Sequence, residues 1–296
     1  MSTPENITFI WDNYVDYDET VLTPSSESTT LPVSNLKNKL RSKVWRSHDV
    51  QQSGELTVIL TIDFTEPKYC RFLGLVGDNL SPDATITLQM NSSDSWSSPP
   101  YEETFKAVES VIGYGEGGFG EWGFGGMYVQ YARKVTPPRC YFLGTDVNGE
   151  VPLYRYAKLT FYDPSNDDGW IDIGKIFLAD YYESDTNYVY GAVHRLVDPS
   201  GAEISSGGVD WSNRKNIYNQ FDLSLPYITT EAKITSFMDM LYSVGQTENF
   251  ILMLDPSTDI GRAFMSFYGR FVGGDFSFVF SAPRRHDVKL TFKEVR

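Results

Sequence analysis

The chain has 296 residues, a length that fits one large domain or two ordinary ones with buried cores. Its net charge of −14 repels polyanions, so we expect neither a nucleic-acid groove nor binding to an anionic membrane surface. No run of about 18 apolar residues occurs, and the first residues lack the regions of a secretory signal, so we expect no membrane insertion and no signal peptide.

Short segments in which apolar and polar residues alternate predict strands with one buried face. Aromatic residues, which favour strands and protein contacts, make up 15% of the chain. A short helix is expected first, over residues 33–40. The predicted strands follow in chain order at 56–63, 71–77, 84–90, 156–162, 171–179, 263–270, 276–281 and 287–295, and turn sequences separate them at 77–79, 163–166 and 272–275.

One longer helix is predicted between the strands at 171–179 and 263–270. Thr229 or Thr230 is a candidate N-terminal cap, and Gly245 occupies the position of a C-terminal cap. Apolar residues recur between them at offsets of three and four, which predicts one face packed on a sheet. The residues of that face are Ile234, Phe237, Met238, Leu241 and Tyr242.

The order of these elements predicts two domains. A β-rich domain covers residues 1–190, and a smaller α+β domain with one well-defined helix covers residues 191–296. The turn sequences near residues 185–215 mark the boundary between them.

Few residues of the chain suit catalysis or metal binding. The three histidines are far apart in the sequence, and no nucleophile or metal-ligand motif occurs, so we expect no enzyme, no cofactor and no metal site. Cys70 and Cys140 lie in apolar, strand-like sequence, which favours buried free thiols and a reducing compartment. Residues 163–169 carry oxygen ligands but lack the spacing of a calcium loop, so an Asx-type turn is the simpler interpretation.

A glycine-rich stretch at residues 113–126 contains the aromatic residues Phe119, Trp122 and Phe124. Three of its glycines satisfy the spacing of a dinucleotide-binding loop, but that motif needs a strand before it and a helix after it, and here further glycines and aromatic residues follow, with Glu116 and Glu121 adding repulsion. Two interpretations stay open for this stretch. It is either a flexible insertion loop, or an interaction loop whose aromatic residues pack against a partner.

Three stretches together resemble discoidin-like (galactose-binding-like) domains in the tail proteins of bacteriophages. They run from Leu31 to Ser47, from Phe72 to Met90 and from Tyr156 to Phe177. The resemblance implies a jelly-roll β-sandwich over about residues 30–180. Residues 92–155, which include the glycine-rich stretch, are an insertion that a simple sandwich does not need.

The resemblance also implies a set of structural core residues. Trp45 is expected to be buried beneath the sandwich with a partner for its indole N–H. Gly77 and Asn79 suit a turn that needs positive φ, and Gly174 suits a bulge in the strand at 171–179. The complete set is Asn35, Trp45, Gly77, Asn79, Gly169 and Gly174.

The resemblance favours one function above two others. The first is a structural virion protein of a phage tail, a tail-tip or baseplate minor tail protein that contacts other phage tail proteins in multiple copies of a symmetric assembly. Such a protein is made and assembled in the host cytoplasm. The alternative is a carbohydrate-binding module that contacts a host surface glycan through loop aromatics such as Trp96, Tyr101 and Trp122. A hydrolase with a carboxylate pair is the third hypothesis, and no residue spacing supports it.

Overall fold

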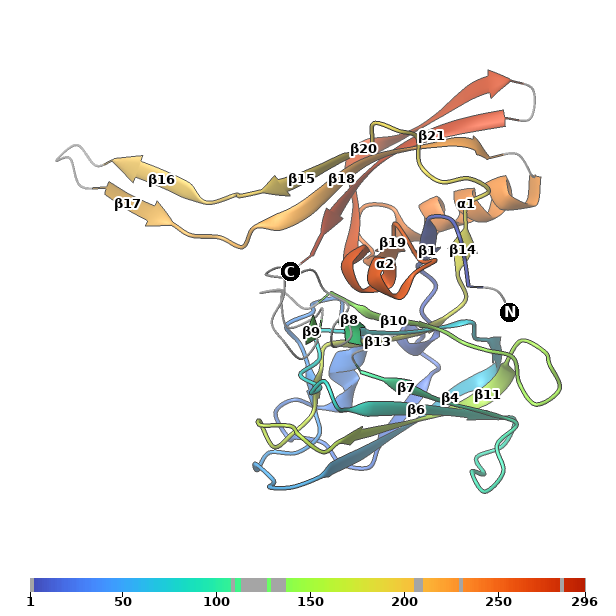
Figure 1. The fold of residues 1–296 in the computed structure, drawn as a ribbon, viewed down its shortest axis with the longest axis vertical. Helices are drawn as coiled ribbons and strands as arrows, with labels where there is room; N and C mark the ends of the chain where they lie inside the picture. The colour runs from blue at the N-terminus through green and yellow to red at the C-terminus, as the bar shows by residue number, and fades with distance from the viewer. Residues whose placement is uncertain are drawn as a thin grey trace. The chain divides into compact units, whose positions relative to one another are not determined.

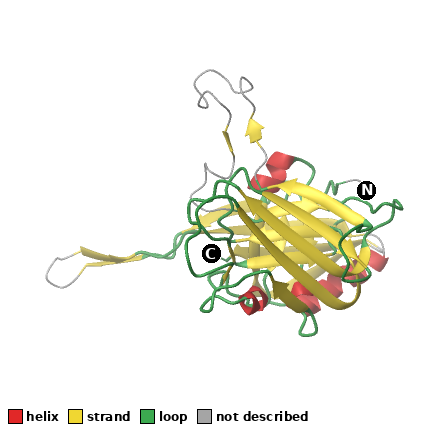
Figure 2. Cartoon of the chain, turned by 90° about the horizontal axis from the view of Figure 1, so that it is seen from below, coloured by secondary structure: helices red, strands yellow, loops and turns green. Residues whose placement is uncertain are grey.

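A computed structural model of the chain describes residues 3–107, 110–112, 127–128, 137–204, 210–228, 231–282 and 285–295. Strands dominate the described residues (Figure 2). The chain forms two compact units, one made of Met1–Tyr181 and Ile251–Phe267 and the other of Tyr182–Phe250 and Tyr268–Arg296. Each unit therefore combines segments that are distant in the sequence.

The first unit is a β-sandwich of two antiparallel sheets (Figure 1). Its five-stranded sheet has the order β2-β4-β11-β6-β7, from Val21–Pro24, Leu56–Tyr69, Leu153–Asp163, Thr85–Asn91 and Tyr101–Lys106. Its three-stranded sheet has the order β10-β5-β13, from Arg139–Phe142, Phe72–Val76 and Lys175–Ala179. The mainly β, jelly-roll (galactose-binding-like) sandwich predicted from the sequence is thus confirmed. Strands β7 and β10 lie within residues 92–155, so part of the expected insertion belongs to the sandwich itself.

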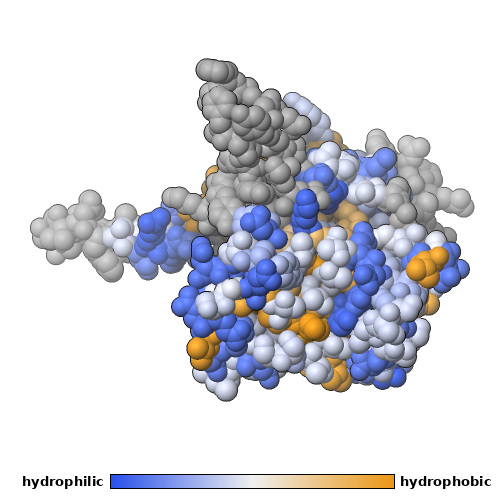
Figure 3. All heavy atoms as spheres, turned by 60° about the horizontal axis from the view of Figure 1, so that its bottom comes forward, coloured by the Kyte–Doolittle hydropathy of each residue, from blue (hydrophilic) through white to orange (hydrophobic). Residues whose placement is uncertain are grey.

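The two sheets share one hydrophobic core. Leu60, Leu159 and Leu88 are register partners on three neighbouring strands of the five-stranded sheet, and all three are fully buried. Each such side chain contributes roughly 1.5–3 kcal/mol through burial. The alternate residues of these strands face outward, and the surface in Figure 3 accordingly shows mostly hydrophilic residues with scattered hydrophobic ones.

Short elements complete the first unit. The predicted helix at 33–40 is a 3-10 helix, η2, at Val33–Lys37. Strand β1 (Thr8–Ile10) pairs with β19 (Phe250–Met253), β3 (Trp45–Arg46) pairs with β12 (Asp172–Ile173), and β8 (Ser110–Ile112) pairs with β9 (Met127–Tyr128). The 3-10 helix η1 (Tyr14–Asp16) and helix α2 (Asp259–Phe264) also belong here.

The second unit is an α+β structure. Its sheet has the order β20-β21-β18-β15, from Ser266–Ala282, Arg285–Glu294, Tyr218–Ile228 and Val193–Val197. A two-stranded hairpin of β16 (Gly201–Ile204) and β17 (Asp210–Asn213) lies beyond β15 and β18 (Figure 1). Strand β14 (Tyr182–Glu183) and helix α1 (Glu231–Val244) complete it. Among the described residues, neither helix has the length and apolar character that a membrane span requires.

Helix α1 confirms the predicted helix, but its buried face differs in part from the predicted one. Phe237, Leu241 and the unpredicted Met240 and Val244 are buried, whereas Met238 and Tyr242 are exposed. Residues at offsets of three and four cover a broad stripe, and tertiary packing decides which side of that stripe is buried.

The predicted turn at 272–275 is wrong, because β20 continues through it as one strand. The register with β21 shifts between Val272 and Ser277, which marks a bulge. Gly273 has a φ of 112°, a conformation that glycine adopts without steric cost. The glycine therefore bends the strand without ending it. The expected strand at 263–270 also begins later, because α2 takes residues up to Phe264.

Candidate functional site

The six predicted core residues come together around the loops that join β3, β5, β12 and β13 in the sandwich. Asn35 donates a hydrogen bond from Nδ2 to the carbonyl of Val44 (2.8 Å) and so fixes the approach to Trp45. Trp45 is fully buried and is the register partner of Ile173. Its indole N–H, however, has no acceptor among the described residues, so the expected partner is not present there.

Gly77 and Gly174 allow two chain segments to approach closely. Gly77 has a φ of 69°, as predicted. The N–H of Gly174 donates to the carbonyls of Val76 and Gly77, both at 3.1 Å. A Cβ at Gly174 would lie 2.7 Å from the carbonyl oxygen of Arg41, so no other residue fits. The expected break in alternation is real, because the chain passes from β12 to β13, in a different sheet, at this glycine.

Asn79 connects three parts of the loop after β11. Its Oδ1 accepts from the N–H of Asp172 (2.8 Å), and its Nδ2 donates to Asp168 Oδ2 (2.8 Å) and to the carbonyl of Trp170 (2.9 Å). The positive φ expected for Asn79 is wrong, since Thr65 is the one non-glycine residue with positive φ in the described part of the chain. Asn79 holds the loop through its side-chain amide instead.

Gly169 completes this loop. Its φ is 73°, and a Cβ there would lie 2.8 Å from the carbonyl oxygen of Gln52. The Oδ1 of Asn166 accepts from the N–H groups of Asp168 (3.0 Å) and Gly169 (3.2 Å), which confirms the Asx-type turn. The described residues hold no cluster of three potential metal ligands.

The surface of these loops carries an aromatic and charged group of side chains. Of its members, Asn79 was predicted only as a core residue, and the grouping of Arg46, Trp170 and Asp172 was not predicted. The guanidinium of Arg46 stacks over the ring of half-buried Trp170, with Cζ 4.3 Å from the ring centroid. Arg46 also donates from Nε and Nη2 to the two carboxylate oxygens of Asp172, both at 2.8 Å. We call Arg46, Trp170, Asp172, Asp168 and Asn79 the Trp170 cluster.

The charge of Arg46 in the Trp170 cluster is stabilised by its partner. The hydrogen bond to Asp172 raises the pKa of Arg46 above its ordinary value. Nearby, Asp49 accepts from the hydroxyl of Ser28 and from the N–H and hydroxyl of Thr29, and these bonds lower the pKa of its carboxyl. His48 Nε2 lies 2.8 Å from the carbonyl oxygen of Gly169 and supports the same loop. The cluster is therefore an aromatic ring held rigidly among charged and amide groups.

A sequence signal for the Trp170 cluster did exist. Arg46 directly follows the buried Trp45, and Asp172 directly precedes the buried Ile173, so alternation places both side chains on the outward face of paired strands. Their pairing spans 126 residues, which no local pattern reveals.

The structure locates some of the other residues named from the sequence. Phe119, Trp122 and Phe124 lie outside the described residues. Trp96 lies in a loop, where its indole N–H donates to Asp94 (2.8 Å). Tyr101 is not a loop residue, because it begins β7 and is buried.

The two cysteines are buried free thiols, as predicted. Burial raises the pKa of Cys70 well above its ordinary value and that of Cys140 to about 12. A thiol that stays protonated is a poor nucleophile. The histidines lie on different elements, and His194 stacks on Phe221 with ring centroids 4.5 Å apart.

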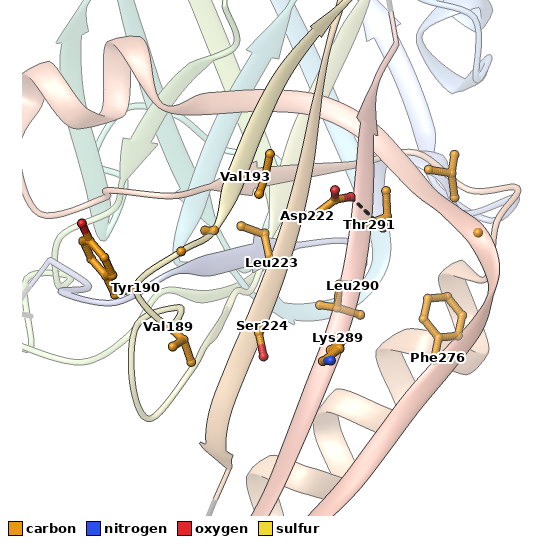
Figure 4. A pocket seen from close by; sticks show the side chains of 14 residues that line it. Val189, Tyr190, Val193, Asp222, Leu223, Ser224, Phe276, Lys289, Leu290 and Thr291 are labelled. Atoms are coloured by element: carbon orange, nitrogen blue, oxygen red, sulfur yellow. Dashed lines mark hydrogen bonds between the residues drawn. The ribbon is translucent and has the colours of Figure 1, made fainter.

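The second unit carries an open pocket of about 400 Å³ on its sheet (Figure 4). Its walls are residues 189–192 and the first residue of β15, Val193, together with residues 222–224 of β18, residues 289–291 of β21 and Val272, Gly273 and Phe276 of β20. No sequence motif pointed to it, because its lining comes from four separate segments.

No protein-family model matches the sequence, and no curated protein matches it. Among solved structures, a Clostridium perfringens family 32 module (CpGH89CBM32-6) is 14% identical, with a TM-score of 0.33, over 57% of this chain and 99% of the module. The family 32 carbohydrate-binding module of C. perfringens NanJ, in complex with galactose, is 11% identical with a TM-score of 0.35, over 59% of this chain and 98% of that one.

A Ruminococcus gnavus GH29 fucosidase in complex with fucose also matches, with 11% identity and a TM-score of 0.36. The match covers 58% of this chain and 27% of the fucosidase. At these low identities and TM-scores, the fold assignment rests on the strand order and pairing described above.

Proposed function

We propose that this chain is a non-enzymatic binding protein whose sandwich takes a carbohydrate at the Trp170 cluster. The observation that carries the proposal is the half-buried Trp170 ring beside Arg46, which two hydrogen bonds to Asp172 hold in place. A sugar has an apolar C–H face and a rim of hydroxyls. The face of the Trp170 ring that Arg46 does not cover suits the apolar side of a sugar, and rigid carboxylate and amide groups suit the hydroxyls.

Rigidity favours binding over catalysis at this cluster. The carboxylate of Asp172 accepts two hydrogen bonds from Arg46, and the backbone N–H of Asp172 donates to Asn79. The side chain of Asn79 makes three hydrogen bonds to this loop. Side chains held in this way lose little conformational entropy when a ligand binds. A general acid or base needs a proton to exchange near neutral pH, whereas the salt bridge keeps Arg46 charged.

A glycan array followed by titration tests this proposal. Galactose and fucose, which are bound in two of the matched structures, are the first probes. Trp170→Ala should weaken binding at least about 10-fold, because it removes the stacking surface. Trp96→Ala removes the loop tryptophan that the sequence predicted as a glycan contact, and it should bind normally if the Trp170 cluster is the site. Absence of any binder at millimolar concentration, or equal binding by both variants, would contradict the proposal.

A second candidate function is that of a structural virion protein of a phage tail, made in the host cytoplasm and acting through contacts with other tail proteins. The strand that favours it is β15, which is exposed along nearly its whole length at the edge of the described sheet of the second unit. Edge strands and exposed apolar side chains are common features of protein interfaces. Purified tail particles should then contain this chain in stoichiometric amounts, and its absence from them would exclude this role.

A non-enzymatic role also predicts that the chain lacks hydrolytic activity. Incubation with peptidoglycan or with a polysaccharide identified by the array should release no products. Turnover that survives purification and disappears on substitution of one carboxylate would show an enzyme instead.

A further inference from the structure

Tyr190, a fully exposed side chain, borders the pocket of the second unit. Tyr190 is 104% exposed, so its ring projects into solvent. Figure 4 shows Tyr190 and Phe276 at opposite ends of the pocket, with Leu223 and Leu290 between them. Tyrosine is one of the residue types that contribute most to interfaces, and an exposed ring at the edge of an open pocket is available to a partner.

We propose that Tyr190 of one copy inserts into this pocket of a second copy of the chain. A surface that carries a projecting ring at one edge of an open pocket can be self-complementary, because the ring of one copy can enter the pocket of the other. A two-fold axis between two such surfaces places each ring in the opposite pocket, which is the isologous arrangement of most dimers. Exposed apolar residues on the adjacent β15, Val193 and Leu196, would form the margin of the contact.

Charge favours a second copy as the occupant. Residues 189–217 contain three basic and three acidic side chains, so their formal charge is zero, and the whole net charge of −14 lies in the rest of the chain. Within the pocket, Asp222 is paired with Arg195 (2.7 Å) and accepts from the hydroxyl of Thr291 (3.0 Å). Two acidic chains repel each other elsewhere, so a neutral segment is where they approach most easily.

This inference goes beyond the carbohydrate site, with which it shares no residue, and it gives the second candidate function a surface and a partner. The experiment measures molar mass by light scattering and sedimentation over a range of protein concentrations. The wild-type chain should shift from 33.6 kDa to twice that mass as concentration rises. Tyr190→Ser should raise the dissociation constant at least about 30-fold.

Tyr242→Ala is the matched control, because Tyr242 is also an exposed tyrosine of this unit, on α1. It should leave the dissociation constant unchanged. A second variant, Ser224→Trp, fills the pocket from β18 and should weaken association as Tyr190→Ser does. An equimolar mixture of the two variants should associate more tightly than either alone, since one ring and one pocket remain intact in the mixed dimer.

A wild-type chain that stays monomeric at about 200 μM, where a weak dimer should form, would overturn the inference. Equal effects of Tyr190→Ser and Tyr242→Ala, or a mixture no tighter than its components, would overturn it too. Circular dichroism and thermal unfolding show whether each variant is folded. If the chain does not dimerise, the two proposed functions are still tested separately. The composition of purified tail particles tests contacts with other tail proteins, and the glycan array tests sugar binding.

Discussion

The two units differ in where they place polar and apolar side chains. In the sandwich, buried polar groups connect the loops: Arg139, 5% exposed, pairs with Asp78 at 2.8 Å, and fully buried Asp163 accepts from the N–H of Ser81 at 2.9 Å. In the second unit, Tyr190 and β15 are exposed. The buried polar pairs of the sandwich therefore hold its loops in place, and on our proposals its surface takes a rigid ligand whereas the exposed side chains of the second unit contact another chain.

Breaking the buried ion pair of the sandwich should have the largest effect. Arg139 donates to Asp78 and to the carbonyls of Ala107 and Leu80. Arg139→Ala leaves the Asp78 carboxylate buried and unpaired, so it should lower the free energy of unfolding by about 3–5 kcal/mol. Urea unfolding followed by tryptophan fluorescence measures the change.

The control for this prediction is Arg155→Ala. Arg155 forms a similar two-bond pair with Asp63, at 2.7 and 2.8 Å, but on the surface. Solvent screens such a pair, so the midpoint of unfolding should hardly move. If both variants lose the same stability, the buried polar groups do not distinguish the sandwich.

The backbones of the two units can be compared at two glycines with positive φ, Gly169 and Gly191. Gly169 in the sandwich has a φ of 73° and lies against Gln52, whereas Gly191 in the second unit has a φ of 101° and nothing within 4 Å of an added Cβ. Gly169→Ala should cost about 1–3 kcal/mol and Gly191→Ala clearly less, because both carry backbone strain but only the first adds a clash. Thermal unfolding midpoints measure both. A greater loss in Gly191→Ala would reverse the comparison.

The two thiols should give the sandwich a measurable pH dependence. Burial raises the pKa of Cys140 to about 12, while the unfolded chain releases the proton near pH 8.5. The unfolded state therefore binds fewer protons above about pH 8.5, and stability falls as pH rises, by up to about 1.4 kcal/mol per thiol and pH unit. Urea unfolding between pH 7 and 10 measures the slope. Replacing Cys70 and Cys140 by Ala should flatten it, and an unchanged slope would show that other groups cause it.

The smallest effect is expected for Trp45→Phe. The substitution removes some packing, but it also removes a buried N–H that has no acceptor among the described residues. These contributions oppose each other, so the free energy of unfolding should change by less than about 1 kcal/mol. A loss of several kcal/mol in urea unfolding would mean that the indole N–H has a partner.

The sequence predicted the sandwich well because its strands separate a core from solvent. In β4, Leu56, Val58, Leu60 and Ile62 are buried and their neighbours less so, as alternation requires. The second unit was harder to predict. Alternation and helical spacing mark apolar faces without saying which of them is covered, and Tyr242 on α1 was assigned to a buried face although it is exposed.

The candidate sites also differ in how far they could be predicted from the sequence. The core residues around Trp45 were identified from a resemblance, and the structure brings them together. Apart from Asn79, which is one of those core residues, the Trp170 cluster was not predicted, because Arg46 and Asp172 meet across 126 residues. The pocket beside Tyr190 joins four segments. Contacts between distant segments depend on tertiary packing, which local patterns do not encode.

Hydrogen–deuterium exchange tests the contrast between the two units most directly, because one experiment reports on both. It compares the chain at low and high protein concentration, each with and without the best sugar from the array. We predict that sugar protects residues 166–172 at both concentrations and that high concentration protects residues 189–197 with or without sugar. Protection of residues 189–197 by sugar alone, or no change in either segment, would contradict this account.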